Sequence, residues 1–280
     1  WGTGDNKGAS NLITPEKVLS ATSLVKSGIV VSLAANEPQV AAADVNENGL
    51  FNRTTLRITD GGTADNYQVS YHGLTVSHMD TWCHFFENGQ MYNGVPVEGN
   101  MNEEEGCKKG SVMNWKDGVT TRAVLYDIAQ LRGVEWVDPN EPITRADLEA
   151  WEEISGVKAG PGDVVLLYIG RWKRRAAEGP WRGQVAGYYA DTIPWIHERM
   201  PAFLGHDFNI DWNPRPGWEG VRNPVHVAAL NWMGINIVEC LDLEEAVSVA
   251  RRLNRYEFLI TFAPLPVEGG TGSPLNPLAI

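Results

Sequence analysis

The stretch Ser77-His78-Met79-Asp80-Thr81-Trp82-Cys83-His84 places three side chains that can bind a metal within seven positions. Side chains alternate between the two faces of a strand, so His78 and Asp80 point the same way if this stretch is extended. His84 lies on that face if the strand continues, or one turn from Asp80 if a helix begins there. An imidazole and a carboxylate suit a borderline cation such as zinc or manganese. The stretch therefore predicts a metal site at the end of a strand.

A second pair of candidate ligands, His226 and Glu239, lies far downstream. Glu239 closes the strand-like segment 235–238, and an ionised carboxylate at the end of a buried strand is costly unless it is paired or binds a cation. Its position therefore favours a polar site. Two other readings stay open: Glu239 meets an arginine at a sheet edge, and His226 is a hydrogen-bonded histidine of the core.

Helix and strand signals alternate along the rest of the chain. Thr14 and Pro15 predict a helix that begins there and is closed by Gly28, and Thr144-Arg145-Ala146-Asp147 has the form of a capping box. Apolar runs and flanking turns predict further elements: extended segments at 29–33, 54–59, 67–80, 123–131, 163–169, 235–238 and 258–262, and helices near 191–200 and 243–253. This order favours a mixed α/β protein, and without repeats or long linkers we expect a single domain, 1–280.

Composition limits the classes of partner. A length of 280 residues with 43% hydrophobic content is enough for a sizeable core. A net charge of −12 and a pI near 5.0 argue against a nucleic-acid-binding protein. The one basic run, Arg171-Trp172-Lys173-Arg174-Arg175, is interpreted as a solvated loop or an anion contact.

The expected compartment is the cytoplasm. The three cysteines are odd in number and widely spaced, without a CxxC pair, which favours a reducing environment. No run of about 18 apolar residues predicts a membrane span, and the first residues show no signal-peptide pattern.

The two constellations together resemble the metal-dependent cyclase family, whose members include kynurenine formamidase, isatin hydrolase and a trans-dienelactone hydrolase. The resemblance rests on His78-x-Asp80-x3-His84, on His226, and on Glu239 thirteen residues later. It extends over most of the chain through further segments: Trp1-Gly2, Asn11-Leu12-Ile13-Thr14-Pro15-Glu16, Met91-Tyr92-Asn93-Gly94, Gly162-Asp163-Val164-Val165-Leu166, Pro264-Leu265 and Gly270-Thr271-Gly272-Ser273-Pro274.

This resemblance implies a fold and a set of roles. The implied fold is a mixed sheet curled into a barrel-like core with peripheral helices, of the swivelling β/β/α type, in a protein that is commonly a homo-oligomer. Zinc or manganese is the implied cofactor, held by His78, Asp80, His226 and Glu239. His84 is implied as a further ligand or as the general acid/base, and Glu239 also as a catalytic residue.

The sequence departs from the family pattern His-x-Gly-Thr-His-x-Asp-x-Pro-x-His at its first histidine, where Leu74 stands. Val76, Ser77 and Cys83 replace the Gly, Thr and Pro. Three outcomes stay open for the missing ligand. The site is rebuilt around His78, Asp80, His226 and Glu239; or His72, which shares strand parity with His78, supplies the imidazole through a bulge; or the site no longer binds metal.

The expected activity is hydrolysis of a small cyclic or aryl amide, lactone or ester. A cation with an open position lowers the pKa of bound water from 15.7 to about 7 and polarises a carbonyl. Trp82 and Trp232 are candidate contacts for a planar substrate, although tryptophan is more often a core residue. The alternatives are a metal-assisted dehydratase or cyclase, and a non-catalytic, aromatic-rich ligand-binding protein.

Overall fold

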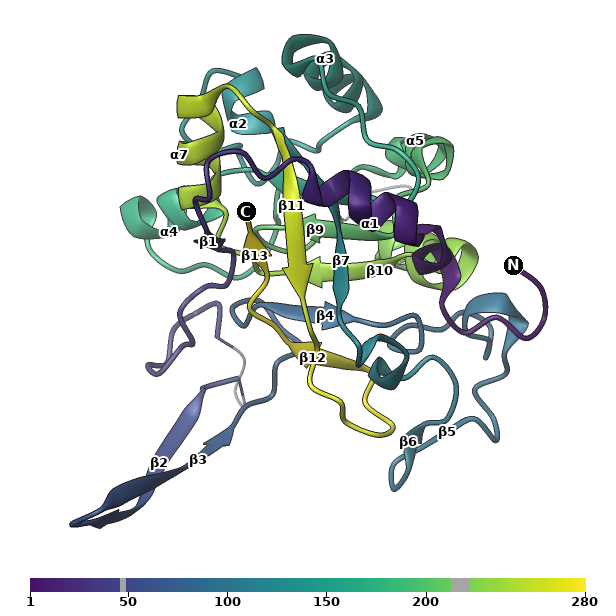
Figure 1. Ribbon diagram of the computed structural model, residues 1–280, viewed down its shortest axis with the longest axis vertical. Coiled ribbons are helices and arrows are strands. Elements are labelled where there is room, and N and C mark those ends of the chain that lie inside the picture. Colours follow the sequence, from purple (N-terminus) through teal and green to yellow (C-terminus); the bar gives the residue numbers. More distant parts are fainter. Residues whose placement is uncertain (46–48, 213–221) are drawn as a thin grey trace.

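A nine-stranded mixed sheet forms the centre of the computed structural model, which describes residues 1–45, 49–212 and 222–280. In Figure 1, β7 and β11 cross the view steeply while β9, β10 and β4 lie flat, so the sheet is strongly curled into a half-barrel. From edge to edge the strands are β1 (Val31–Ser32), β13 (Leu278–Ala279), β11 (Glu257–Phe262), β7 (Val119–Asp127), β8 (Val164–Tyr168), β9 (Phe203–His206), β10 (Asn236–Glu239), β4 (His78–Asp80) and β12 (Gly272–Pro274).

Parallel pairing is confined to the middle of the sheet, from β7 through β8 and β9 to β10. The strands on either side pair in the antiparallel sense. All five residues of β8 are buried, as expected for a strand covered on both faces. The mixed α/β class and the curled sheet agree with the prediction.

Helices surround this sheet. They are α1 (Pro15–Thr22), α2 (Ile128–Leu131), α3 (Arg145–Ser155), α4 (Arg171–Glu178), α5 (Ile193–Arg199), α6 (Pro224–His226) and α7 (Glu244–Leu253). Helix α1 packs on β7 and β11, and α3 packs on β7. Among the residues described, no helix is both long and apolar enough to span a bilayer.

Two smaller pairs of strands lie outside the sheet. One is the short pair β5 (Met101–Asn102) and β6 (Gly106–Cys107), and the other is the long hairpin of β2 (Asn52–Thr59) and β3 (Gly62–Gln68). The hairpin projects from the body in Figure 1, and all but one of its strand residues are exposed. It therefore contributes little to the core.

Local signals located several elements correctly. The hydroxyl of Thr14 accepts a hydrogen bond from Lys17 N at the start of α1, and Thr144 and Asp147 form the expected capping box of α3. The predicted strand at 235–238 is confirmed as β10, displaced by one residue at both ends, and the predicted helix at 243–253 is confirmed as α7, which begins one residue later.

Other expectations were wrong. Helix α1 ends at Thr22 instead of near Gly28, because the hydroxyls of Thr22 and Ser23 bond to carbonyls three residues back. The extended segment 67–80 is interrupted: β3 ends at Gln68, and β4 begins only at His78.

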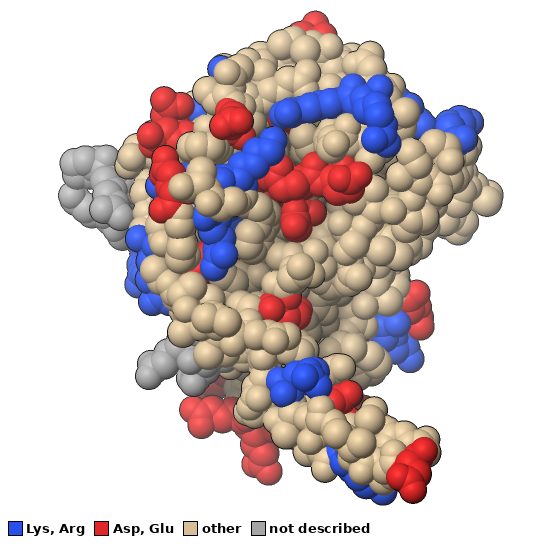
Figure 2. Space-filling view, turned by 90° about the vertical axis from the view of Figure 1, so that its left-hand side faces the viewer, with Lys and Arg blue, Asp and Glu red and all other residues tan. Residues whose placement is uncertain are grey.

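The basic run 171–175 is also not the solvated loop that was expected, because it forms the start of α4. Arg171 is buried there and pairs with Asp44 at 3.1 Å. On the face shown in Figure 2, basic and acidic side chains are interspersed and form no continuous basic surface.

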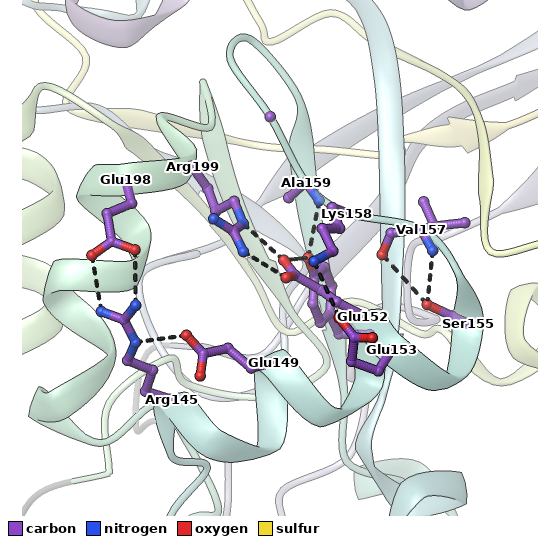
Figure 3. A network of polar contacts seen from close by, with 12 residues as sticks. Arg145, Glu149, Glu152, Glu153, Ser155, Val157, Lys158, Ala159, Glu198 and Arg199 are labelled. Carbon is purple, nitrogen blue, oxygen red and sulfur yellow. Dashed lines mark hydrogen bonds and ion pairs between the residues drawn. The ribbon is translucent and has the colours of Figure 1, made fainter.

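A network of ion pairs links α3 to α5 (Figure 3). Arg199 donates two hydrogen bonds, of 2.8 and 2.6 Å, to the carboxylate of Glu152, which is 1% exposed. Arg145 pairs with Glu149 and Glu198, and all three side chains are more than one third exposed. The buried pair and the exposed pairs therefore differ in the solvation of the carboxylate.

Replacement of Arg199 by leucine should lower the free energy of unfolding by about 3 kcal/mol, because it leaves the buried carboxylate of Glu152 without its counterion. Arg145→Leu is the matched control and should lower the free energy of unfolding much less, since its partners Glu149 and Glu198 are exposed. Urea unfolding measures both values. Equal losses in the two variants would contradict the distinction.

Candidate metal centre

Strands β4 and β10 bring three predicted ligands together. Antiparallel pairing places Glu239 directly opposite His78, and opposite residues share a face of the sheet. Asp80, two residues after His78, points to that face as well. All three side chains are buried, and one donor atom from each lies within 4.8 Å of the other two. The strand parity predicted from the sequence is therefore what assembles this half of the site.

The imidazole of His78 is oriented by the backbone. Its Nδ1 lies 2.7 Å from the carbonyl oxygen of Val76, which can only accept, so Nδ1 carries the proton. Nε2 then offers its lone pair 3.5 Å from Asp80 Oδ1. Burial lowers the pKa of His78, which keeps the ring neutral. A neutral imidazole with its second nitrogen held by a carbonyl is the form that binds metals.

Asp80 lies at the centre of the histidines. Its Oδ1 is 2.8 Å from His72 Nδ1, and its Oδ2 is 3.9 Å from His84 Nε2. Burial raises the pKa of Asp80, but the imidazoles of His84, His78 and His72 outweigh burial and hold it below its usual range. The carboxylate is thus ionised and available as a ligand.

His84 lies beyond the end of β4, in a turn where its backbone N–H donates to Thr81 O at 2.9 Å. It occupies neither a continued strand nor a helix, yet its side chain still faces Asp80. Burial lowers the pKa of His84 to about 4. The side chain is 25% exposed, which places it at the rim of the site.

The second constellation meets the first through Glu239. His226 Nε2 lies 3.4 Å from Glu239 Oε1, and His226 Nδ1 contacts Asp211 Oδ2. Glu239 also accepts from the backbone N–H of Ile210 at 2.7 Å and from the side-chain amide of Asn209 at 3.4 Å. The partner of Glu239 is therefore a histidine of the site and not an arginine at a sheet edge.

Burial and charge act in opposite directions on this pair. Burial lowers the pKa of His226, but the carboxylates of Glu239 and Asp211 outweigh it and raise the pKa to about 9. Burial raises the pKa of Glu239 to about 7, against the effect of His226. Two buried carboxylates thus flank one imidazole, an arrangement that favours positive charge between them.

His226 is the last residue of α6 and leads into the π-helix Val227–Met233. Such wide turns are rare and frequent at functional sites. The ring of Phe85 stacks on His226 with centroids 4.7 Å apart. An aromatic ring therefore covers one face of this imidazole and limits its contact with water.

A second group of donor atoms includes His72, which lies outside the pattern His78-x-Asp80-x3-His84. Donor atoms of His72, Asp80 and His84 lie within 4.8 Å of one another. The rings of His72 and His84 are parallel, with centroids 3.9 Å apart. Asp80 belongs to both groups of donors, so the five side chains form one continuous cluster.

The two predicted aromatic contacts differ in exposure. Trp82 is fully buried, and its indole N–H donates to Asn6 O at 3.3 Å. Trp232 is 60% exposed and lines a cavity of about 320 Å³ together with Trp1, Tyr92 and Met200. A substrate-binding role for either residue stays a prediction.

Asp211 is the main residue that the sequence analysis missed. It follows β9, and the carboxyl ends of the parallel strands β9 and β10 meet at one edge of the sheet, where polar residues commonly form sites. A second cavity, of about 240 Å³, adjoins this edge. Its lining comprises Leu74, Gly183, Gln184, Val185, Asn209, Asp211 and Asn223.

Comparison with known proteins identifies the family. Residues 29–212 match the family model described as "Putative cyclase". The crystal structure of a novel cyclase is 30% identical, with a TM-score of 0.85 over 100% of this chain and 95% of that one. The chain belongs to the cyclase family.

Solved structures of lower sequence identity share the fold of this cyclase-family protein. Isatin hydrolase A from Labrenzia aggregata, bound to benzyl benzoate, is 20% identical, with a TM-score of 0.63 over 94% of this chain and 98% of that one. A predicted metal-dependent hydrolase from Bacillus stearothermophilus is 17% identical, with a TM-score of 0.54 over 90% and 97%. No curated protein matches the chain.

The tautomer of His78 can be tested without metal. In chelator-treated protein at neutral pH, ¹⁵N NMR of the histidine rings should show His78 protonated on Nδ1 and unprotonated on Nε2, because Val76 O accepts a hydrogen bond from Nδ1. His78→Gln assigns the signals. An unprotonated Nδ1 would contradict the ring orientation of His78, in which Nε2 is the atom that faces Asp80.

Proposed function

We propose that this cyclase-family protein is a metal-dependent hydrolase that opens a small cyclic or aryl amide, lactone or ester. The observation that supports it most is the convergence of His78, Asp80 and Glu239 on buried, adjacent strands. Two carboxylates are seldom buried side by side without a cation between them, because each loses its hydration. The names of the structural relatives, isatin hydrolase and predicted metal-dependent hydrolase, point in the same direction.

The donor set fits a divalent cation. His78 supplies Nε2 and Asp80 and Glu239 supply carboxylate oxygens, while His226 faces Glu239 with its own Nε2. Nitrogen and oxygen donors of this kind suit zinc or manganese. Asp211 and the Val76 carbonyl hold the outer nitrogens of the two imidazoles, the support that metal-binding histidines usually have.

When bound, the cation supplies Lewis acidity, which lowers the pKa of water and polarises a carbonyl group. The protein residues supply the proton transfers and the positioning. Glu239 and His226 lie 3.4 Å apart and can hold the proton released from the attacking water. His84 faces the site from its rim; because its pKa is lowered to about 4, the ring is neutral at pH 7 and can take up a proton and pass it to the leaving nitrogen or oxygen.

The cavity of about 240 Å³ supports a small substrate. It contacts the site through Asp211 and Asn209, which bond to His226 and Glu239. This volume is slightly below the usual range for ligand pockets, about 300–1,000 Å³. Its amide side chains suit an uncharged polar group such as a carbonyl, in keeping with a lactone, ester or amide.

Protein purified without chelator or affinity metal should contain zinc or manganese, measured per chain by plasma mass spectrometry. His78→Ala and Asp80→Asn should each lose at least about 90% of it, because each removes a donor, and both should keep the wild-type circular dichroism spectrum. The exposed His197 on α5 gives the control His197→Ala, which should retain the metal. Full metal content in both site variants would contradict the assignment.

Hydrolysis should incorporate oxygen from solvent into the product. Turnover of lactones, aryl esters and cyclic amides in H₂¹⁸O, followed by mass spectrometry, should give one ¹⁸O per product, and Asp80→Asn should lower kcat/KM at least about 1,000-fold. Metal-dependent turnover without ¹⁸O would favour a dehydratase or cyclase. Binding of these compounds without turnover would favour a non-catalytic protein.

A further inference from the structure

Leu74, at the position of the first histidine in the family pattern, takes no part in metal binding. A leucine side chain has no donor atom. Leu74 packs against the hydrophobic core, and its carbonyl oxygen accepts a hydrogen bond from Arg171 Nη2 at 2.5 Å. The backbone at Leu74 is therefore held by a buried arginine. An imidazole in place of the pattern's first histidine must come from another residue.

His72 lies two residues earlier and faces the site. Its Nδ1 is 2.8 Å from Asp80 Oδ1, its ring is parallel to that of His84 at 3.9 Å, and its edge meets His78 with centroids 5.5 Å apart. The donor atoms of His72, Asp80 and His84 lie within 4.8 Å of one another. The irregular backbone between β3 and β4 permits this approach, which strand parity alone did not decide.

We infer that His72 supplies the metal-binding imidazole missing at Leu74, and that Thr271 is the residue that positions it. The inference rests on the proposed metal centre. Thr271 Oγ1 lies 3.1 Å from His72 Nε2, the ring nitrogen that points away from Asp80. A hydroxyl both donates and accepts, so it supports His72 whether or not Nδ1 gives up its proton to bind a cation.

The turn that carries Thr271 is fixed to the strand of ligands. Thr271 O accepts from both the backbone N–H and the hydroxyl of Thr81, at 3.0 and 2.9 Å. The next residue, Gly272, pairs with Asp80 across β12 and β4. Thr271 is therefore hydrogen-bonded to the residue that follows Asp80, which fixes the position of its hydroxyl relative to Asp80.

Gly272 provides the space for this arrangement. A Cβ atom at position 272 would lie 2.2 Å from Met79 O and 3.1 Å from His72 Cε1. Any side chain there would push β12 from β4 or the imidazole from its place. The Gly-Gly-Thr-Gly turn at 269–272 therefore contacts the His72 imidazole through Thr271 and leaves space for it at Gly272.

Cation affinity tests the inference without any substrate. Chelator-stripped wild type and variants are titrated with zinc and with manganese in competition with a chromogenic chelator. His72→Ala and His72→Gln should bind at least about 100-fold more weakly. Thr271→Val should bind about 10- to 100-fold more weakly, the usual effect of removing a partner of a ligand, and Thr271→Ser should remain within about threefold of wild type.

A threonine outside the site gives the matched control. Thr261 on β11 contacts Thr120 at 3.0 Å, and Thr261→Val should leave the affinity unchanged. The electronic spectrum of the cobalt-substituted proteins adds a second readout, because loss of an imidazole changes it whereas a general loss of stability does not. Circular dichroism confirms that each variant is folded.

The outcomes separate this inference from the proposed function. Wild-type affinity in both His72 variants would overturn the ligand role of His72 while leaving a centre of His78, Asp80 and Glu239. Weakened His72 variants with an unaffected Thr271→Val would overturn the positioning role of Thr271. A wild-type protein that takes up neither cation would overturn the proposed function and this inference together.

Discussion

The antiparallel pairing of β4 with β10 is the interaction on which the site depends. It sets Glu239 opposite His78, although 161 positions separate them in sequence numbering (239 − 78). A shift of one residue in this register would turn Glu239 to the opposite face of the sheet. Strand β4 has only three residues, but hydrogen bonds to the strands on both sides, β10 and β12, fix its position.

This pairing concentrates charge in the interior. Asp80, Glu239 and Asp211 are all buried, and the side chains that can carry positive charge beside them are imidazoles. Such a cluster lowers the stability of a fold unless its charges are matched. By contrast, the buried carboxylate of Glu152 pairs with the guanidinium of Arg199. The contrast supports a functional origin for the cluster, since local violations of packing rules tend to occur at functional sites.

Loops and turns supply the residues of the site that the strands do not carry. The loop before β4 brings in His72, the turn after it brings in His84, and the turn before β12 brings in Thr271. Each is tied to the sheet by backbone hydrogen bonds, such as those of Thr81 with Thr271. Precise placement of loop residues therefore follows from their attachment to rigid strands.

The sequence by itself determined the features that depend on neighbouring residues. Strand parity placed His78 and Asp80 on one face, and side-chain caps located the starts of α1 and α3. Only the tertiary structure decided that Asp211 supports His226 and that Thr271, 199 positions away, contacts His72. These contacts depend on the order and curl of the strands, and no local pattern of side chains encodes which distant segments a curled sheet brings together.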